Sequence, residues 1–221
     1  MSDIFREVDE EVRHDEAVRL WEKYQGALIA LAVIVVAATA GWRYYDYQRT
    51  QKAQEAGARY QAALVLSREA KGPEANAALR GLAAADTPAG YRALASLRLA
   101  GETGRTDAAA GAKAFDALAA DASLDPLLQA VAKLRAALLR LDTADAAELK
   151  ARLDPLAGPG EPFRHSAREM LGLAALKAGD VDAAGRWFDA IVTDADAPQP
   201  VRDRAEAMLG LVRSGKQQAT K

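Results

Sequence analysis

Hydrophobic positions concentrate in one uninterrupted run of this sequence. From Tyr24 to Trp42 the chain runs 19 residues without a charged side chain. A helix of that length rises roughly 28 Å, close to the ~30 Å hydrocarbon thickness of a bilayer. Aromatic side chains, which favour the lipid–water interface, lie at both edges of the run: Trp21 and Tyr24 at one edge, and Trp42, Tyr44, Tyr45 and Tyr47 at the other. The pattern predicts a transmembrane helix over residues 24–42.

Two other interpretations of the run remain open. A buried core helix has the same composition, although core helices rarely continue this far without a charge. A cleaved signal peptide is the second, because Ala38-Thr39-Ala40 has the small-residue pattern of a cleavage site. The preceding 23 residues are acidic, whereas a signal peptide begins with a short basic region, so an uncleaved anchor is favoured.

Small residues follow one face of the predicted span. Gly26, Ala30, Ala37 and Gly41 are separated by intervals of 4, 7 and 4 residues. Such a face lets a second helix pack closely within lipid, although alanine and glycine are abundant throughout this chain. We expect these positions to form a face for packing against another transmembrane helix.

The charges on either side of the span do not decide its orientation. Residues 1–23 contain four basic and eight acidic side chains, and residues 43–62 also contain four basic ones. The positive-inside rule counts lysine and arginine close to the membrane, so the two sides tie. The sequence leaves both topologies open.

Hydrophobic spacing and proline positions divide the remaining chain. Residues 1–23 are expected to form a short amphipathic segment, and residues 43–70 to continue as a stalk helix that enters the folded domain, since every proline lies at or after Pro73. Residues 71–214 alternate helical patterns with glycine and proline breaks, and residues 215–221 form a disordered polar tail. No segment shows the sustained alternation of a strand, so the predicted fold class is all-α.

An internal repeat indicates how these helices pack. Phe115-Asp116-Ala117-Leu118 reappears 73 residues later as Phe188-Asp189-Ala190-Ile191. With Leu79 and Leu153 included, the large apolar positions are spaced 36, 38 and 35 residues apart. These intervals approach the 34-residue tetratricopeptide period. We therefore predict an α-solenoid of antiparallel helix pairs in a tetratricopeptide-like arrangement.

The last copy has the clearest repeat signature. Gly172, Gly179, Ala184 and Phe188 occupy the small, turn, small and large positions of a tetratricopeptide repeat. Small residues let two antiparallel helices approach, and the phenylalanine fills the space toward the next pair. An ordinary helical hairpin in an alanine-rich chain remains the alternative.

Composition argues against most catalytic chemistry. The chain has no cysteine, and its two histidines, His14 and His165, lie on opposite sides of the predicted span. His165 is expected to be a capping or surface residue at a helix start. Neither a catalytic constellation, nor a metal-ligand set, nor a cofactor fingerprint is present, so we predict no enzyme, no cofactor and no small-molecule substrate. Beyond residue 23 the chain has 25 basic and 23 acidic residues, which excludes the basic footprint of a nucleic-acid binder.

With catalysis and nucleic-acid binding excluded, protein binding is the remaining function class, and the groove formed by stacked helix pairs is its expected site. The first helix of each pair would line that groove. Its most suitable aromatic and polar contacts are Tyr60, Tyr91, Arg92 and Arg98. Ordinary solvated or inter-repeat positions are an equally good explanation of these four residues.

The arrangement resembles a known family. A segment that reads DIFREVDEEVR from Asp3 to Arg13, then Trp21-x-Lys23-Tyr24, one span and a repeat domain, is similar to bacterial tetratricopeptide-repeat inner-membrane proteins of the ancillary SecYEG translocon subunit family, in its alphaproteobacterial form. The resemblance implies a cytoplasmic N-terminus, a periplasmic repeat domain, and contact with translocon subunits and periplasmic chaperones or emerging chains. It supplies no catalytic residues. The alternative function is a structural scaffold for envelope assembly or cell division that acts by self-association.

Overall fold

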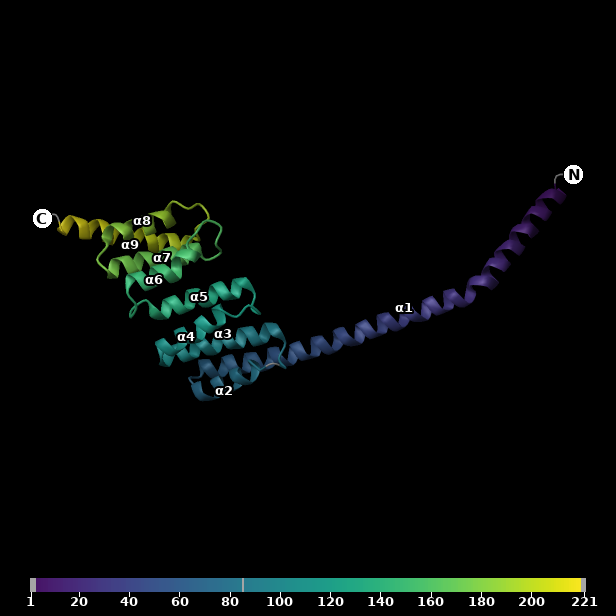
Figure 1. Cartoon of the computed structure of the whole chain (residues 1–221), viewed down its shortest axis with the longest axis horizontal. Coiled ribbons are helices and arrows are strands. Elements are labelled where there is room, and N and C mark those ends of the chain that lie inside the picture. The colour runs from purple at the N-terminus through teal and green to yellow at the C-terminus, as the bar shows by residue number, and fades with distance from the viewer. Residues whose placement is uncertain (1–2, 85, 220–221) are drawn as a thin grey trace. The chain divides into compact units, whose positions relative to one another are not determined.

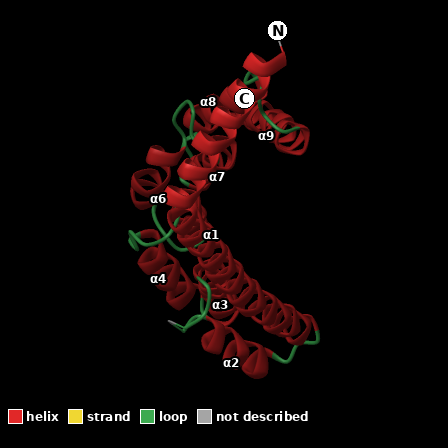
Figure 2. Cartoon of the chain, turned by 90° about the vertical axis from the view of Figure 1, so that its right-hand side faces the viewer, coloured by secondary structure: helices red, strands yellow, loops and turns green. Residues whose placement is uncertain are grey.

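The computed structural model describes residues 3–84 and 86–219, and every regular element within these ranges is helical (Figures 1 and 2). The predicted all-α fold class is confirmed. The elements are α1 (Asp3–Arg68), α2 (Gly72–Leu82), α3 (Ala89–Thr106), α4 (Ala108–Ala119), α5 (Pro126–Arg140), α6 (Ala146–Leu153), the short 3-10 helix η1 (Asp154–Leu156), α7 (Arg164–Lys177), α8 (Val181–Val192) and α9 (Gln199–Ala219).

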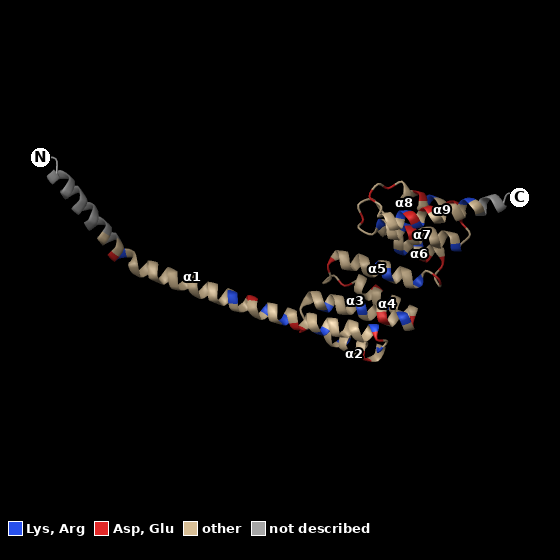
Figure 3. Cartoon of the chain, turned by 180° about the vertical axis from the view of Figure 1, so that it is seen from behind, with Lys and Arg blue, Asp and Glu red and all other residues tan. Residues whose placement is uncertain are grey.

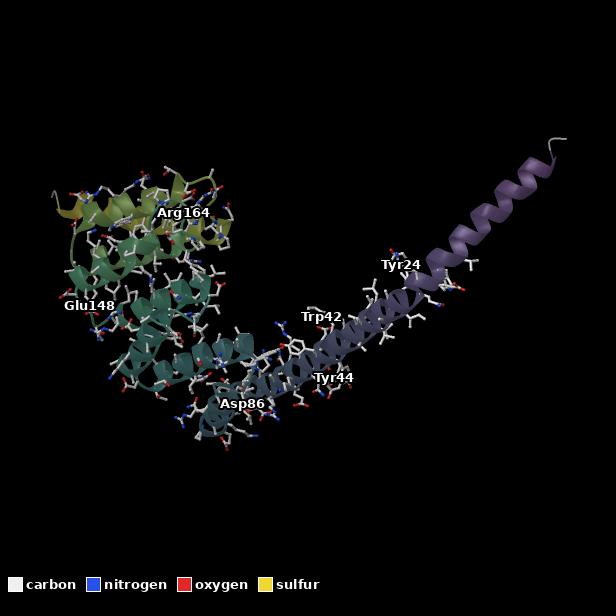
Figure 4. All side chains as sticks on the ribbon, turned by 45° about the vertical axis from the view of Figure 1, so that its right-hand side comes forward. Tyr24, Trp42, Tyr44, Asp86, Glu148 and Arg164 are labelled. Carbon is white, nitrogen blue, oxygen red and sulfur yellow. The ribbon has the colours of Figure 1, made fainter. Side chains whose placement is uncertain are left out.

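The chain divides into two compact units within α1, one ending at Glu55 and the other beginning at Ala56. In the first unit, every side chain from Trp21 to Thr50 is exposed. Figure 3 shows the stretch without lysine, arginine, aspartate or glutamate along α1, and Figure 4 labels Tyr24 and Trp42 at its edges. This stretch makes α1 the one helix in the described residues that is long and apolar enough to cross a membrane. No residue of this apolar stretch is buried, which argues against the core helix of a soluble protein.

The second unit is a stack of helix pairs in which each pair shares a core with the next. Ala56 and Ala63 at the end of α1 are buried together with Leu79 and Leu82 of α2 and Ala95 of α3. Further clusters of buried side chains join α3, α4 and α5, then α5, α6 and α7, and finally α7, α8 and α9. Repeating units that bury side chains only against their neighbours are typical of a solenoid.

The four large residues that defined the repeat each lie in a different one of these clusters. Leu79, Leu153 and Phe188 are fully buried, and Phe115 is 4% exposed. In the last pair, a Cβ at Gly172 would lie 2.7 Å from the Phe188 ring, so only glycine allows that ring to pack against α7. Large anchors and small neighbours thus occupy complementary positions.

The turns of the last three helix pairs have a common chemistry, whereas the turn between α1 and α2 has no side-chain cap. The side chains of Asp107, Asp145 and Asp180 accept a backbone hydrogen bond at the N-termini of α4, α6 and α8, respectively. An aspartate cap satisfies an otherwise unpaired backbone N–H and suits the positive end of the helix dipole. Before the last of these, Gly179 has a φ of +79°, a backbone conformation that strongly favours glycine.

The structure gives positions for the ends of two predicted segments. Residues 56–68 of α1 pack as the first helix of the first pair, so the packed unit begins inside the segment 43–70, which was predicted as a stalk helix that enters the domain. Helix α9 continues to Ala219, into the segment 215–221 that was predicted as a tail. Both helices continue because no proline interrupts them there. Residues 1–2 and 220–221, at the ends of the predicted outer segments, lie outside the described residues.

Candidate partner-binding groove

A groove of about 450 Å³ opens on the repeat unit between the first helices of successive pairs. Tyr60 from the end of α1 lines one side, residues 94–105 of α3 line the middle, and Val131 and Arg135 of α5 line the other side. Phe115 of α4 is the one lining residue that comes from the second helix of a pair. The groove therefore depends on the stacking of three pairs, and no single repeat would form it.

Glycines determine the packing beneath the groove. A Cβ on Gly111 of α4 would lie only 2.4 Å from the Cα atom of Gly104 in α3, so the two helices touch backbone to backbone. A Cβ on Gly104 would in turn meet Leu139 of α5 at 2.7 Å. Phe115 approaches to 3.9 Å of the Cβ position at Gly101. Three helices thus meet closely around Phe115, which contributes apolar surface to the groove.

One buried carboxylate organises the charged side of the groove. Glu102 is 8% exposed and accepts a hydrogen bond from the Ser67 hydroxyl at 2.5 Å. Arg98 and Arg105 lie 2.7 and 3.2 Å from its oxygen atoms. Burial raises the pKa of Glu102, but the Ser67 hydroxyl and the two guanidinium charges outweigh it, so the pKa of Glu102 lies below its ordinary value. The ionised carboxylate ties α3 to the last turn of α1 and orients two arginines.

The groove brings together two of the four predicted binding residues. Tyr60 and Arg98 both line it. Tyr91 instead packs α3 onto α1, with its hydroxyl 2.7 Å from the Cβ position of Gly57 and its ring 6.3 Å from that of Tyr60. Arg92 lines a separate hollow that includes Asp121. Tyr91 lies two turns before Arg98 on the same face of α3, so it is displaced along the helix toward Gly57, whereas Arg92 points about 120° away from that face.

Sequence reasoning missed three charged residues of the groove. These are Glu102, Arg105 and Arg135. The spacing from Arg98 to Glu102 and from Glu102 to Arg105 is that of ion pairs on one helix face, so it was a usable signal. No comparable signal marked Arg135, because it reaches the groove from the next pair.

A second charged cluster joins α7 to the loop that follows α8. Asp194, after α8, accepts hydrogen bonds from Arg164 at 3.0 Å and from Arg168 at 3.0 Å, both on α7. The Nε2 atom of His165 lies 3.0 Å from the same carboxylate. Hydrogen bonds from Arg164, partly opposed by burial and supported by His165, hold the pKa of Asp194 well below its usual range.

The position of His165 corrects the sequence interpretation. It was expected to be a capping or surface residue, but it is 7% exposed and contacts Asp194. The reason is tertiary, because the start of α7 packs beneath the loop that follows α8. Each charged group in this cluster has a partner, so the cluster stabilises the packing of α7 against the loop after α8.

Other features of the described residues offer less for recognition. A hollow of about 580 Å³ near Trp187 is lined mainly by alanines of α7 and α8. Its charged members include Lys150, which pairs with Asp154, and Asp180, which caps α8. No group of three or more potential metal ligands occurs in the part of the chain that the structure describes. Along the predicted span, the Cβ positions of Gly26 and Gly41 meet no atom within 4 Å, so this part of the small-residue face is open.

Comparison with known proteins agrees with this architecture. Residues 19–207 match the family described as "Tetratricopeptide repeat-like domain". The chain is 31% identical over 177 residues to the "Ancillary SecYEG translocon subunit" of Escherichia coli (strain K12), and the match covers 79% of this chain and 84% of that protein. No solved structure matches the chain. The chain therefore belongs to the tetratricopeptide repeat-like family of the ancillary SecYEG translocon subunit.

Proposed function

We propose that this protein is a membrane-anchored interaction module that acts beside the Sec translocon and links it to periplasmic chaperones or emerging chains. Residues 24–42 would span the inner membrane once, with residues 1–23 in the cytoplasm and the repeat domain in the periplasm. The protein would recruit partners by binding and would carry out no chemical step. No nucleic acid, cofactor or small-molecule substrate enters this function.

The observation that carries the proposal is the similarity to the ancillary translocon subunit over 84% of that protein's length. The match includes the repeat domain, so it extends beyond a shared apolar helix. Two features of this chain support the same function. It has one helix suited to a bilayer, and it has a groove formed by three helix pairs.

Within the repeat domain, we assign partner contact first to Tyr60 and Arg98, which line the groove. Tyr91 packs α3 onto α1 and Arg92 lines a separate hollow, so any partner contact from these two residues would lie outside the groove. In the membrane, we assign contact with another helix to the face that contains Gly26, Ala30, Ala37 and Gly41, since small side chains permit close helix packing in lipid.

Site-specific photocrosslinking in intact membranes tests the proposal. A photoreactive residue at Leu94, which lines the groove and is 41% exposed, is compared with one at Leu138, which is 47% exposed and outside the groove. Translocon subunits or periplasmic chaperones recovered from position 94 and absent from position 138 support the proposed function. Recovery of only further copies of this protein from position 94 would instead support the self-associating scaffold.

Orientation requires its own measurement, because the charges beside the span are balanced. Protease is added to spheroplasts, and the repeat domain is followed with an antibody beside a known periplasmic protein. The proposed topology predicts digestion of both. Survival of the repeat domain while the control is digested would overturn it.

A further inference from the structure

We propose that the groove takes a segment of a partner protein that combines apolar side chains with carboxylates. This inference rests on the proposed function and specifies the chemistry of the partner. Its basis is that three arginines and an exposed apolar surface meet in one groove, although they come from different helix pairs.

The charge of the groove is positive where it is accessible. Arg98 is 40% and Arg105 is 66% exposed in their side chains, and Arg135 is also exposed. The single carboxylate among the lining residues, Glu102, is buried and already engaged by two of these arginines. Arg135 has no ion pair within the described part of the chain. The groove therefore presents cationic groups that an incoming carboxylate can neutralise.

Apolar side chains separate these arginines. Leu94 is 41% exposed, and Leu97, Phe115, Val131 and Leu139 complete the apolar lining. A volume of about 450 Å³ accommodates a few side chains of a bound segment. Burial of such side chains supplies binding free energy, while the arginines determine which segments fit.

A protein segment fits this arrangement better than an anionic lipid surface. Basic clusters that bind anionic lipid contain about four to eight lysines and arginines in one segment, whereas three arginines here are distributed over α3 and α5 around an apolar centre. A ligand that contacts all of these groups must carry both leucine-like and acidic side chains.

Binding of defined peptides to the full-length protein tests this inference. The protein is placed in nanodiscs of neutral lipid, and fluorescence anisotropy is measured with three short labelled peptides of equal length. One combines leucine with glutamate, one leucine with lysine, and one serine with glutamate. We expect the leucine–glutamate peptide to bind most tightly.

Matched variants assign the binding to the groove. Arg135→Glu should weaken binding of the leucine–glutamate peptide by about tenfold, because an attraction becomes a repulsion. Lys133→Glu changes the net charge equally on the same helix but outside the groove, and should leave affinity within about twofold. Leu94→Ala should weaken binding, whereas Leu138→Ala should not.

Several results would overturn the inference. If the leucine–lysine peptide binds as tightly as the leucine–glutamate peptide, the arginines do not select acidic segments. Equal binding of the serine–glutamate peptide would reduce the groove to a general anion site, such as one for lipid phosphate. Equal losses of affinity in Arg135→Glu and Lys133→Glu would show that the overall charge of the domain, and not the groove, determines peptide binding. If these outcomes occur while Leu94 still crosslinks to translocon subunits, the inference fails and the proposed function stands.

Discussion

The backbone contact between α3 and α4 predicts that a glycine-to-alanine substitution destabilises the domain at this contact, although the same substitution stabilises an exposed helix position. Gly111→Ala places a Cβ 2.4 Å from Cα and 2.6 Å from N of Gly104, and neither atom belongs to a side chain that can rotate away. The helices must separate, which also disturbs Leu139 on α5. We expect the domain to lose stability at this site.

The magnitude follows from two opposing contributions. Overpacking costs about 1–3 kcal/mol, and contact with backbone favours the upper end of that range. Alanine recovers about 1 kcal/mol through its greater helix propensity. The net loss is about 2 kcal/mol, which lowers Tm by about 4–8 °C for a domain of this size.

Gly210→Ala is the matched control for that prediction. Gly210 lies within α9, is exposed, and has no atom within 4 Å of its Cβ position. Only the gain in helix propensity applies there, about 0.5–1 kcal/mol, so Tm should rise by about 1–4 °C. Thermal unfolding of the full chain in detergent, followed by circular dichroism, measures both variants. The reasoning is refuted if Gly111→Ala melts at or above the wild type, or if both variants shift in the same direction.

Three further predictions concern the last helix pair. Phe188→Ala removes a fully buried ring and should cost about 3–5 kcal/mol in urea unfolding, while a loss below about 1 kcal/mol would contradict its role as a core anchor. Gly179→Ala forces a Cβ onto a residue with φ of +79° and should cost about 1–2 kcal/mol, with Gly179→Asn milder; equal costs would argue against backbone strain. Because the pKa of Asp194 in the folded protein lies below its ordinary value of 3.8, the ionised carboxylate stabilises the fold above that pH, and this stabilisation is lost as pH falls further. The stability gap between wild type and Asp194→Asn at pH 7 should therefore shrink below about pH 4, and a gap that widens on acidification would refute the assignment.

The repeat architecture was accessible from the sequence because its signal is local and recurs. Leu79, Phe115, Leu153 and Phe188 mark the same position in successive copies, and each lies in a different buried cluster. Pairing of Gly172 with Phe188 follows from the same logic of small and large residues. Such patterns reflect contacts within a repeat or between neighbours, which a fixed spacing encodes.

The candidate groove was only partly predictable, because its residues come from helices whose rotation and stacking have no local signature. Tyr60 and Arg98 were identified from residue type and position in a first helix, but the same reasoning selected Tyr91, which packs between helices. Arg135 reaches the groove only when α5 stacks beside α3. His165 shows the same limitation, since its burial depends on the loop after α8.

The sequence by itself determined the all-α class, the charge-free helix from Tyr24 to Trp42 and the repeat period, because each depends on residues near one another along the chain. Only the tertiary structure decided which arginines share a groove, which carboxylate neutralises two of them, and that α1 supplies the first helix of the repeat stack. Those features depend on how far one helix is rotated and displaced against the next. That geometry is determined by side-chain packing between helices, including the contact of Gly104 with Gly111.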